Sequence, residues 1–127
     1  MKVKDIIFIL FIVLTIFITG CTYGSYSIKV GSVDMGNNEI SGSYSEFNGF
    51  KSKNYDFEEG DSLNFDTEIE TESGELKILL LDEDKNILQE ISESGESNYE
   101  VKETSDYTIR VEAIEHKGSF SVKIEAK

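Results

Sequence analysis

The 127-residue chain contains no proline and no tryptophan, and it has only one cysteine and one histidine. A single cysteine excludes a disulfide within one molecule, so packing alone must hold the fold together. One cysteine and one histidine also cannot supply the ligands of a zinc site built from these residue types. Serine–histidine catalysis would have to use His116, and the chain has no Gly-x-Ser-x-Gly or Ser-x-x-Lys motif. We expect no enzyme activity, and we expect His116 to be a solvated side chain in a turn.

The one long apolar run lies at the start of the chain. It extends from Ile6 to Ile18, follows Lys2 and Lys4, and is interrupted only by Thr15. The run is shorter than the ~20 residues that a membrane-spanning helix needs. A basic start, a short apolar stretch and small residues at its end are typical of a secretory signal peptide.

The tetrapeptide Ile18-Thr19-Gly20-Cys21 ends this run. It resembles the lipobox of bacterial lipoproteins, with isoleucine in place of the commoner leucine. The resemblance implies cleavage of the bond between Gly20 and Cys21, and a diacylglycerol on the sulfur of Cys21. Two other interpretations, an uncleaved anchor helix or an ordinary signal peptide cut nearby, would leave Cys21 an incidental thiol.

These features predict three segments: a lipoprotein signal peptide at 1–20, a lipidated tether at 21–25 and a single folded domain at 26–127. The expected location is extracytoplasmic, with attachment to the cell membrane through the lipid on Cys21. A composition rich in lysine, isoleucine, glutamate and asparagine fits a Gram-positive host.

Basic residues are scarce throughout the chain. There are 25 acidic and 12 basic residues in the full sequence, and 24 and 10 after residue 20. A surface of this sign repels phosphate backbones, so we expect no nucleic-acid partner. It also offers no polybasic segment that would bind anionic lipid.

Apolar and polar residues alternate with period two over most of the domain, which is typical of half-buried strands. The phase of the alternation slips around Asn48-Gly49, which indicates a bulge or corner. Short polar segments at 72–74 and 115–118 are expected to be turns, and the latter should join 107–113 and 119–126 as an antiparallel hairpin. The sequence therefore predicts an all-β, jelly-roll-like antiparallel sandwich of eight or nine short strands.

Three segments of the domain, SGELKILLLDEDKNIL, SDYTIRVEA and KGSFSVKIEA, resemble the small jelly-roll or PPC-like β-sandwich domains of exported bacterial proteins. The similarity covers about residues 62–126. It implies a non-catalytic appendage or surface module, and we expect a binding or structural module at the bacterial cell surface. The partner would be an envelope protein or a glycan.

The segment Asp82-x-Asp84-x-Asn86 matches the first three ligand positions of a calcium-binding EF-hand loop. Ile87 replaces the required glycine, and Asp and Asn also favour ordinary turns. Calcium-assisted binding of a carbohydrate or protein is therefore an alternative function, with a plain turn as the competing interpretation of these residues. No other cofactor is expected.

Six aromatic residues lie within 22 positions, and some of them must fill a core that has no tryptophan. Rings exposed on a sheet can instead hold sugars or peptides. Tyr44 and Tyr55 are the best ligand-binding candidates because each keeps a polar tip. A hydrolase with two carboxylates is a further hypothesis, and it requires a cleft that gathers two buried acids.

Overall fold

The computed structural model describes residues 22–127, which form six strands. Among these residues no helix is long and apolar enough to span a bilayer. The strands are β1 (Thr22–Met35), β2 (Glu39–Phe57), β3 (Ser62–Leu81), β4 (Ile87–Ile91), β5 (Gly95–Glu100) and β6 (Ser105–Ala126).

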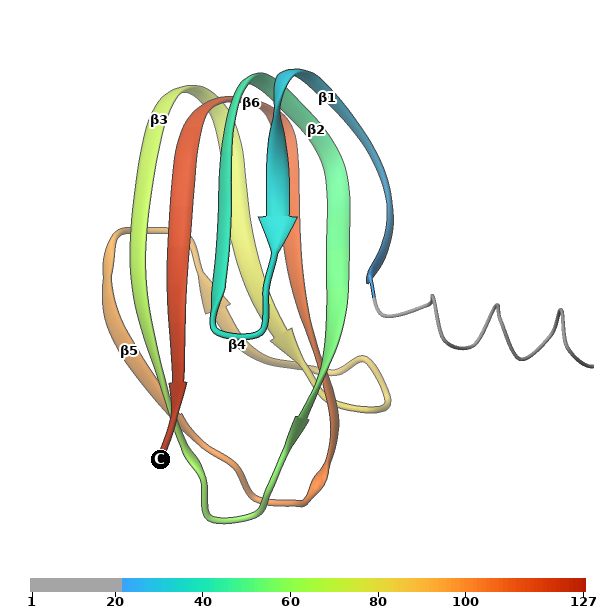
Figure 1. The fold of residues 1–127 in the computed structure, drawn as a ribbon, viewed down its shortest axis with the longest axis vertical. Coiled ribbons are helices and arrows are strands. Elements are labelled where there is room, and N and C mark those ends of the chain that lie inside the picture. Colours follow the sequence, from blue (N-terminus) through green and yellow to red (C-terminus); the bar gives the residue numbers. More distant parts are fainter. Residues whose placement is uncertain (1–21) are drawn as a thin grey trace, which may run out of the picture.

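All strand pairs are antiparallel, in the order β1-β2-β6-β3-β4, with β5 also paired to β3. The long strands β2, β6 and β3 arch over at one end of the molecule, so that their two halves face each other (Figure 1). The first part of β3 pairs with β5 and its last part with β4. The same strands therefore build both layers of a sandwich, which confirms the predicted all-β antiparallel class.

The prediction of eight or nine short strands is wrong, because two expected turns are bends within continuous strands. Residues 107–113 and 119–126 do not pair with each other as a hairpin; both belong to β6 and pair with β2 and β3. The pairing of β3 with β6 shifts its register between Thr71 and Glu75, beside the bend. The pairing of β2 with β6 shifts its register between Tyr44 and Gly49. These irregularities bend the sheet, and the second of them confirms the predicted bulge near Asn48-Gly49.

Gly118 allows β6 to turn this corner in close contact with β3. Its φ is 149°, and a Cβ atom added there would collide with the backbone carbonyl oxygen of Glu70. Glu115, on the other side of the corner, has a φ of 45°. Together these residues produce a sharp bend at which the pairing register shifts and the strand continues.

The assignment of residues 21–25 to a tether is corrected for residues 22–25, which form the start of β1. Thr22 pairs with Lys53, and Ser25 pairs with Phe50. Gly24 lies so close to β2 that a Cβ atom would strike the carbonyl oxygen of Phe50. The glycine therefore serves close packing at the edge of the sheet.

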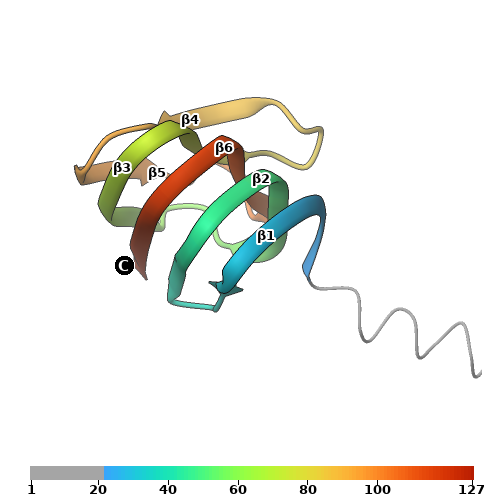
Figure 2. The same ribbon diagram turned by 90° about the horizontal axis from the view of Figure 1, so that it is seen from above.

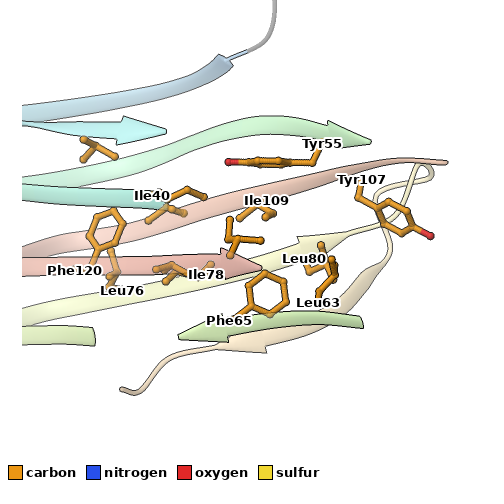
Figure 3. Packing of buried hydrophobic residues seen from close by; sticks show 14 of the residues in the cluster. Ile40, Tyr55, Leu63, Phe65, Leu76, Ile78, Leu80, Tyr107, Ile109 and Phe120 are labelled. Atoms are coloured by element: carbon orange, nitrogen blue, oxygen red, sulfur yellow. The ribbon is translucent and has the colours of Figure 1, made fainter. Parts of the chain in front are cut away.

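The hydrophobic core fills the space between the two layers (Figure 3). Its side chains come from both halves of the three long strands; Ile40 and Tyr55, for example, lie on opposite halves of β2. Tyr55 stacks on Phe57 with a centroid distance of 5.8 Å, and Phe57 contacts Tyr107 at the same distance. Aromatic packing thus closes the end of the sandwich opposite the bends.

Candidate binding surface

The predicted lipidation and cleavage residues, Gly20 and Cys21, lie outside the described residues. The remaining candidates from the sequence can be placed, and the structure does not bring them together in one site.

Tyr44 and Tyr55 are buried, which corrects the prediction that they bind a ligand. Tyr44 is 8 % exposed and Tyr55 is 7 % exposed. The hydroxyl of Tyr55 donates a hydrogen bond to the carbonyl oxygen of Gly36 at 2.6 Å, and burial raises the pKa of Tyr55 to about 12. Both rings fill the core that a chain without tryptophan must build from other side chains.

His116 is fully buried, which corrects the prediction of a solvated turn residue. Its Nδ1 lies 2.6 Å from the hydroxyl oxygen of Tyr44, and its Nε2 lies 2.9 Å from Oγ1 of Thr71. Burial lowers the pKa of His116, so the neutral ring is favoured. The imidazole therefore links β2, β6 and β3 at the bend, and it cannot serve as a general base at the surface.

Asp82 organises the turn that follows β3. Its Oδ1 accepts hydrogen bonds from the backbone N–H of Asp84 and Asn86, and its Oδ2 accepts one from the side-chain amide of Asn86. The bonds from Asn86 hold the pKa of Asp82 below its usual value. Among residues 22–127, no group of three or more Asp, Glu, His and Cys side chains is arranged to hold a metal ion. The geometry supports the turn interpretation, since the carboxylate that would lead a calcium loop is engaged by the turn itself.

A ladder of side chains on the outer face of one layer forms the candidate binding surface. It consists of four successive cross-strand pairs between β2 and β6, which we call the outer-face strip: Phe50 with Glu112, Ser52 with Arg110, Asn54 with Thr108, and Asp56 with Asp106. At about 3.4 Å per residue, the strip is roughly 20 Å long.

Arg110 contacts three other side chains at the Phe50 end of the outer-face strip. Its guanidinium carbon lies 4.6 Å from the centroid of the Phe50 ring, and its Nε donates a hydrogen bond to Oγ of Ser52 at 3.1 Å. Its Nη1 lies 3.8 Å from a carboxylate oxygen of Glu112. Leu79 of β3, which pairs with Arg110, is buried on this outer face and is not part of the core cluster. The arginine is thus oriented by an aromatic ring, a hydroxyl and a carboxylate.

Hydrogen bonds also order the middle of the strip. Thr108 is 2 % exposed, and its hydroxyl donates to Oδ1 of Asn54 at 3.0 Å while accepting from Nζ of Lys85 at 2.9 Å. These contacts fix the carbonyl side of the Asn54 amide, and Asn54 itself is exposed. A rigid sheet therefore presents side chains whose positions are set before any ligand arrives.

The acidic end of the strip borders an open hollow of about 450 Å³. Asp56 and Asp106 line it together with Glu58 and Glu83. The pKa of Asp56 is raised, first by a side-chain hydrogen bond with Asp106 and then by the negative charge of that carboxylate. Both aspartates are exposed to solvent, unlike the buried acids that the hydrolase hypothesis requires.

Asp106→Asn is expected to raise the melting temperature at pH 7. The folded-state pKa of Asp56 is raised above the unfolded carboxyl value of about 4. A protonated Asp56 therefore stabilises the folded state at low pH, and this stabilisation is lost as the pH rises and the carboxyl group ionises. At neutral pH the two charges repel across the strands, and the amide removes that repulsion.

Thermal unfolding of wild type and Asp106→Asn between pH 2.5 and pH 7 measures this effect. The difference in melting temperature should disappear at the acidic end of the range. The matched control is Asp66→Asn, since Asp66 pairs with Lys123 across the strands and its change should not stabilise the protein. A stabilisation from Asp106→Asn that does not depend on pH would show that the pair does not repel.

The outer-face strip was not predicted from the sequence, although the phase slip indicates which residues share its face. Before the bulge in β2, the even-numbered residues Ile40, Gly42 and Tyr44 face the core. After the bulge, the odd-numbered residues Tyr55 and Phe57 face it. The phase slip therefore turns Phe50 outward. Combined with the alternation in β6, where Ile109 and Val111 are buried, it would have placed Arg110 on the same face.

No family model matches the sequence, and no curated protein sequence matches it. Among solved structures, the chain is similar to tailspike protein 4 of bacteriophage CBA120, with 15% identity over 84% of this chain and a TM-score of 0.47. It is also similar to Xylanase10C from Cellvibrio japonicus, solved with xylopentaose (8% identity, 84% of this chain, TM-score 0.46). The chain spans only 19% of the tailspike and 26% of the xylanase.

TmCBM61, solved with β-1,4-galactotriose, is similar over most of both chains. Its identity is 16% over 84% of this chain and 87% of that chain, and its TM-score is 0.49. At these low scores the likenesses carry no function over to this chain. The sandwich architecture is established by the strand pairing described above.

Proposed function

We propose that the protein is a lipid-anchored, extracytoplasmic β-sandwich that acts as a non-catalytic binding module at the bacterial cell surface. The observation that carries this proposal is the outer-face strip, in which a stacked arginine and an ordered amide are displayed on a rigid sheet. Guanidinium, amide and carboxylate groups beside an aromatic ring suit a ligand rich in hydroxyl groups. We assign the strip to an envelope glycan, with an envelope protein as the alternative ligand.

A binding role fits the residues of the domain better than a catalytic one. The imidazole of His116 is engaged on both nitrogens inside the bend. A lipidated Cys21 is a thioether and provides no thiolate nucleophile. The paired carboxylates of Asp56 and Asp106 lie open to water, where neither is protected as a general acid. The calcium-assisted alternative would need the oxygens of Asp82, which the turn already uses.

Arg110→Ala is expected to weaken binding of residues 22–127 to purified envelope glycan by about tenfold or more. The reason is that a charged hydrogen-bond donor contributes about 1.5–3 kcal/mol, and 1.4 kcal/mol corresponds to a factor of ten in affinity. Co-sedimentation with the insoluble glycan measures the affinity.

Lys123→Ala is the matched control for this experiment. It also removes one positive charge from an outward-facing position, but on the opposite layer, where Lys123 pairs with Glu39 and Asp66. It should bind like wild type. Equal losses in the two variants would mean that net charge, and not the strip, governs binding.

Cys21→Ala is expected to move the protein from the membrane fraction to the soluble fraction. Attachment through two acyl chains is stable, and the acidic domain has no polybasic segment to replace it. Fractionation of cells expressing the full chain, followed by immunoblotting, measures the distribution. Ser25→Ala, a change near the same end of the domain, should remain in the membrane fraction. A Cys21→Ala protein that has lost residues 1–20 and still stays with the membrane would rule out the lipid anchor.

A further inference from the structure

The folded domain begins directly after the proposed lipidation site. Thr22 is the first residue of β1 and pairs with Lys53, and Gly24 is pressed against the backbone of β2. Consecutive Cα atoms lie about 3.8 Å apart, so a lipid on Cys21 would be attached to the edge of the sheet without a flexible spacer. The edge strand β1 would therefore be held at the bilayer surface.

The charge of the domain is distributed unevenly with respect to this edge. Residues 22–57, which contain β1 and β2, carry 4 acidic and 3 basic residues, whereas residues 58–127 carry 20 acidic and 7 basic residues. Figure 2 shows β1 and β2 together at one side of the molecule, away from β4. The negative surface of anionic lipids repels the acidic part and not the nearly neutral part, so it favours the same orientation as the attachment point.

The exposed side chains of β1 suit the interface between lipid headgroups and water. Tyr26 is 47 % exposed, and Val30 is 85 % exposed. Nζ of Lys51 lies 5.1 Å from the centroid of the Tyr26 ring. A tyrosine, with its apolar ring and polar tip, is enriched at membrane interfaces.

The far end of β1 is closed to pairing with another strand. Lys51 donates to the carbonyl oxygen of Val33 at 2.7 Å, and Lys53 donates to the carbonyl oxygen of Met35 at 3.2 Å. Lysines that occupy edge carbonyls disfavour the addition of a strand from a second chain. Contact of this edge with a lipid surface is therefore favoured over pairing with a strand of another protein.

We propose that the β1 edge of the sandwich lies against the headgroups of the membrane and that the acidic edge at β4 and β5 points away from it. This inference rests on the proposed lipid anchor. The orientation turns the outer-face strip sideways, close to the bilayer, so that its ligand would be a component of the membrane-proximal envelope.

The test uses the full chain with lipidated Cys21, reconstituted into vesicles of phosphatidylcholine and phosphatidylglycerol that contain a headgroup spin-labelled lipid. Because the sulfur of Cys21 is then a thioether, an introduced cysteine is the only free thiol for a fluorophore. Ser27→Cys places the fluorophore on β1, and Ser92→Cys places it beside β4; both serines are exposed. The spin-labelled lipid should quench the fluorophore at position 27 and leave the one at position 92 unchanged.

A spacer variant tests whether the short attachment sets the orientation. Ten Gly/Ser residues inserted between Cys21 and Thr22 add a root-mean-square reach of about 16–19 Å. Quenching at position 27 should fall toward the value at position 92. Unchanged quenching with the spacer would overturn the inference.

The other outcomes distinguish this inference from the anchor on which it rests. Equal quenching at positions 27 and 92, with the protein still floating with the vesicles, would overturn the orientation and leave the anchor intact. Absence of quenching at position 27, together with thiol crosslinking between two copies of the unlabelled Ser27→Cys variant, would assign the edge to a second copy. Failure of the protein to float with vesicles would overturn both proposals.

Discussion

Gly118→Ala is expected to lower the free energy of unfolding by about 3 kcal/mol or more, or to prevent folding. The added methyl group would meet the backbone carbonyl oxygen of Glu70, which cannot move without distorting β3. Both strands are central in the sheet, so the distortion would spread through the bend. Urea denaturation followed by circular dichroism measures the loss.

Gly95→Ala is the matched control for this prediction. Gly95 has a φ of 143°, close to the 149° of Gly118, but nothing lies within 4 Å of a Cβ atom added there. It should cost only the backbone strain, about 1 kcal/mol. If the two variants lose the same stability, Gly118 does not pack against β3, and residues 115–118 form the isolated turn that the sequence suggests.

His116→Ala is expected to lower the free energy of unfolding by about 3 kcal/mol. The change opens a cavity at the bend and leaves the hydroxyls of Tyr44 and Thr71 without their partner. Lys117→Ala, at the exposed neighbouring position, should change the stability by less than about 0.5 kcal/mol. A small loss in His116→Ala would mean that the imidazole does not hold the three strands together.

The pH dependence of the free energy of unfolding tests the role of His116 independently. The folded-state pKa of His116 is lowered, whereas an unfolded histidine has a pKa of about 6.5. The unfolded state therefore binds more protons below that pH, and the wild-type protein should lose stability as the pH falls from about 7.5 to about 5.5. His116→Gln should lack this part of the pH dependence. Identical slopes for wild type and His116→Gln would contradict a buried neutral histidine.

The alternation of apolar and polar residues was sufficient to predict the fold class. It failed at the bends, because a tight hairpin turn and a bulged bend have the same local signature of polar residues and a glycine. Only the pairing partners distinguish them. In β6 both halves pair with β2 and β3, and these contacts are remote in the sequence.

The same limitation explains the misplaced candidate residues. His116 lies between Glu115 and Lys117, which suggests exposure, but alternation within a continuous strand turns it inward. Tyr44 and Tyr55 have polar tips, yet the bend provides a buried partner for one and the β1–β2 turn provides a carbonyl for the other. By contrast, Phe50 and Arg110 belong to different strands, and no local pattern shows that they stack.

The most direct test of the proposed binding function is the affinity of residues 22–127 for purified envelope glycan, compared among wild type, Arg110→Ala and Lys123→Ala. We predict that wild type and Lys123→Ala bind equally and that Arg110→Ala loses about tenfold or more in affinity. No binding by the wild-type domain, or equal binding by all three proteins, would contradict the assignment of the outer-face strip as a glycan-binding surface.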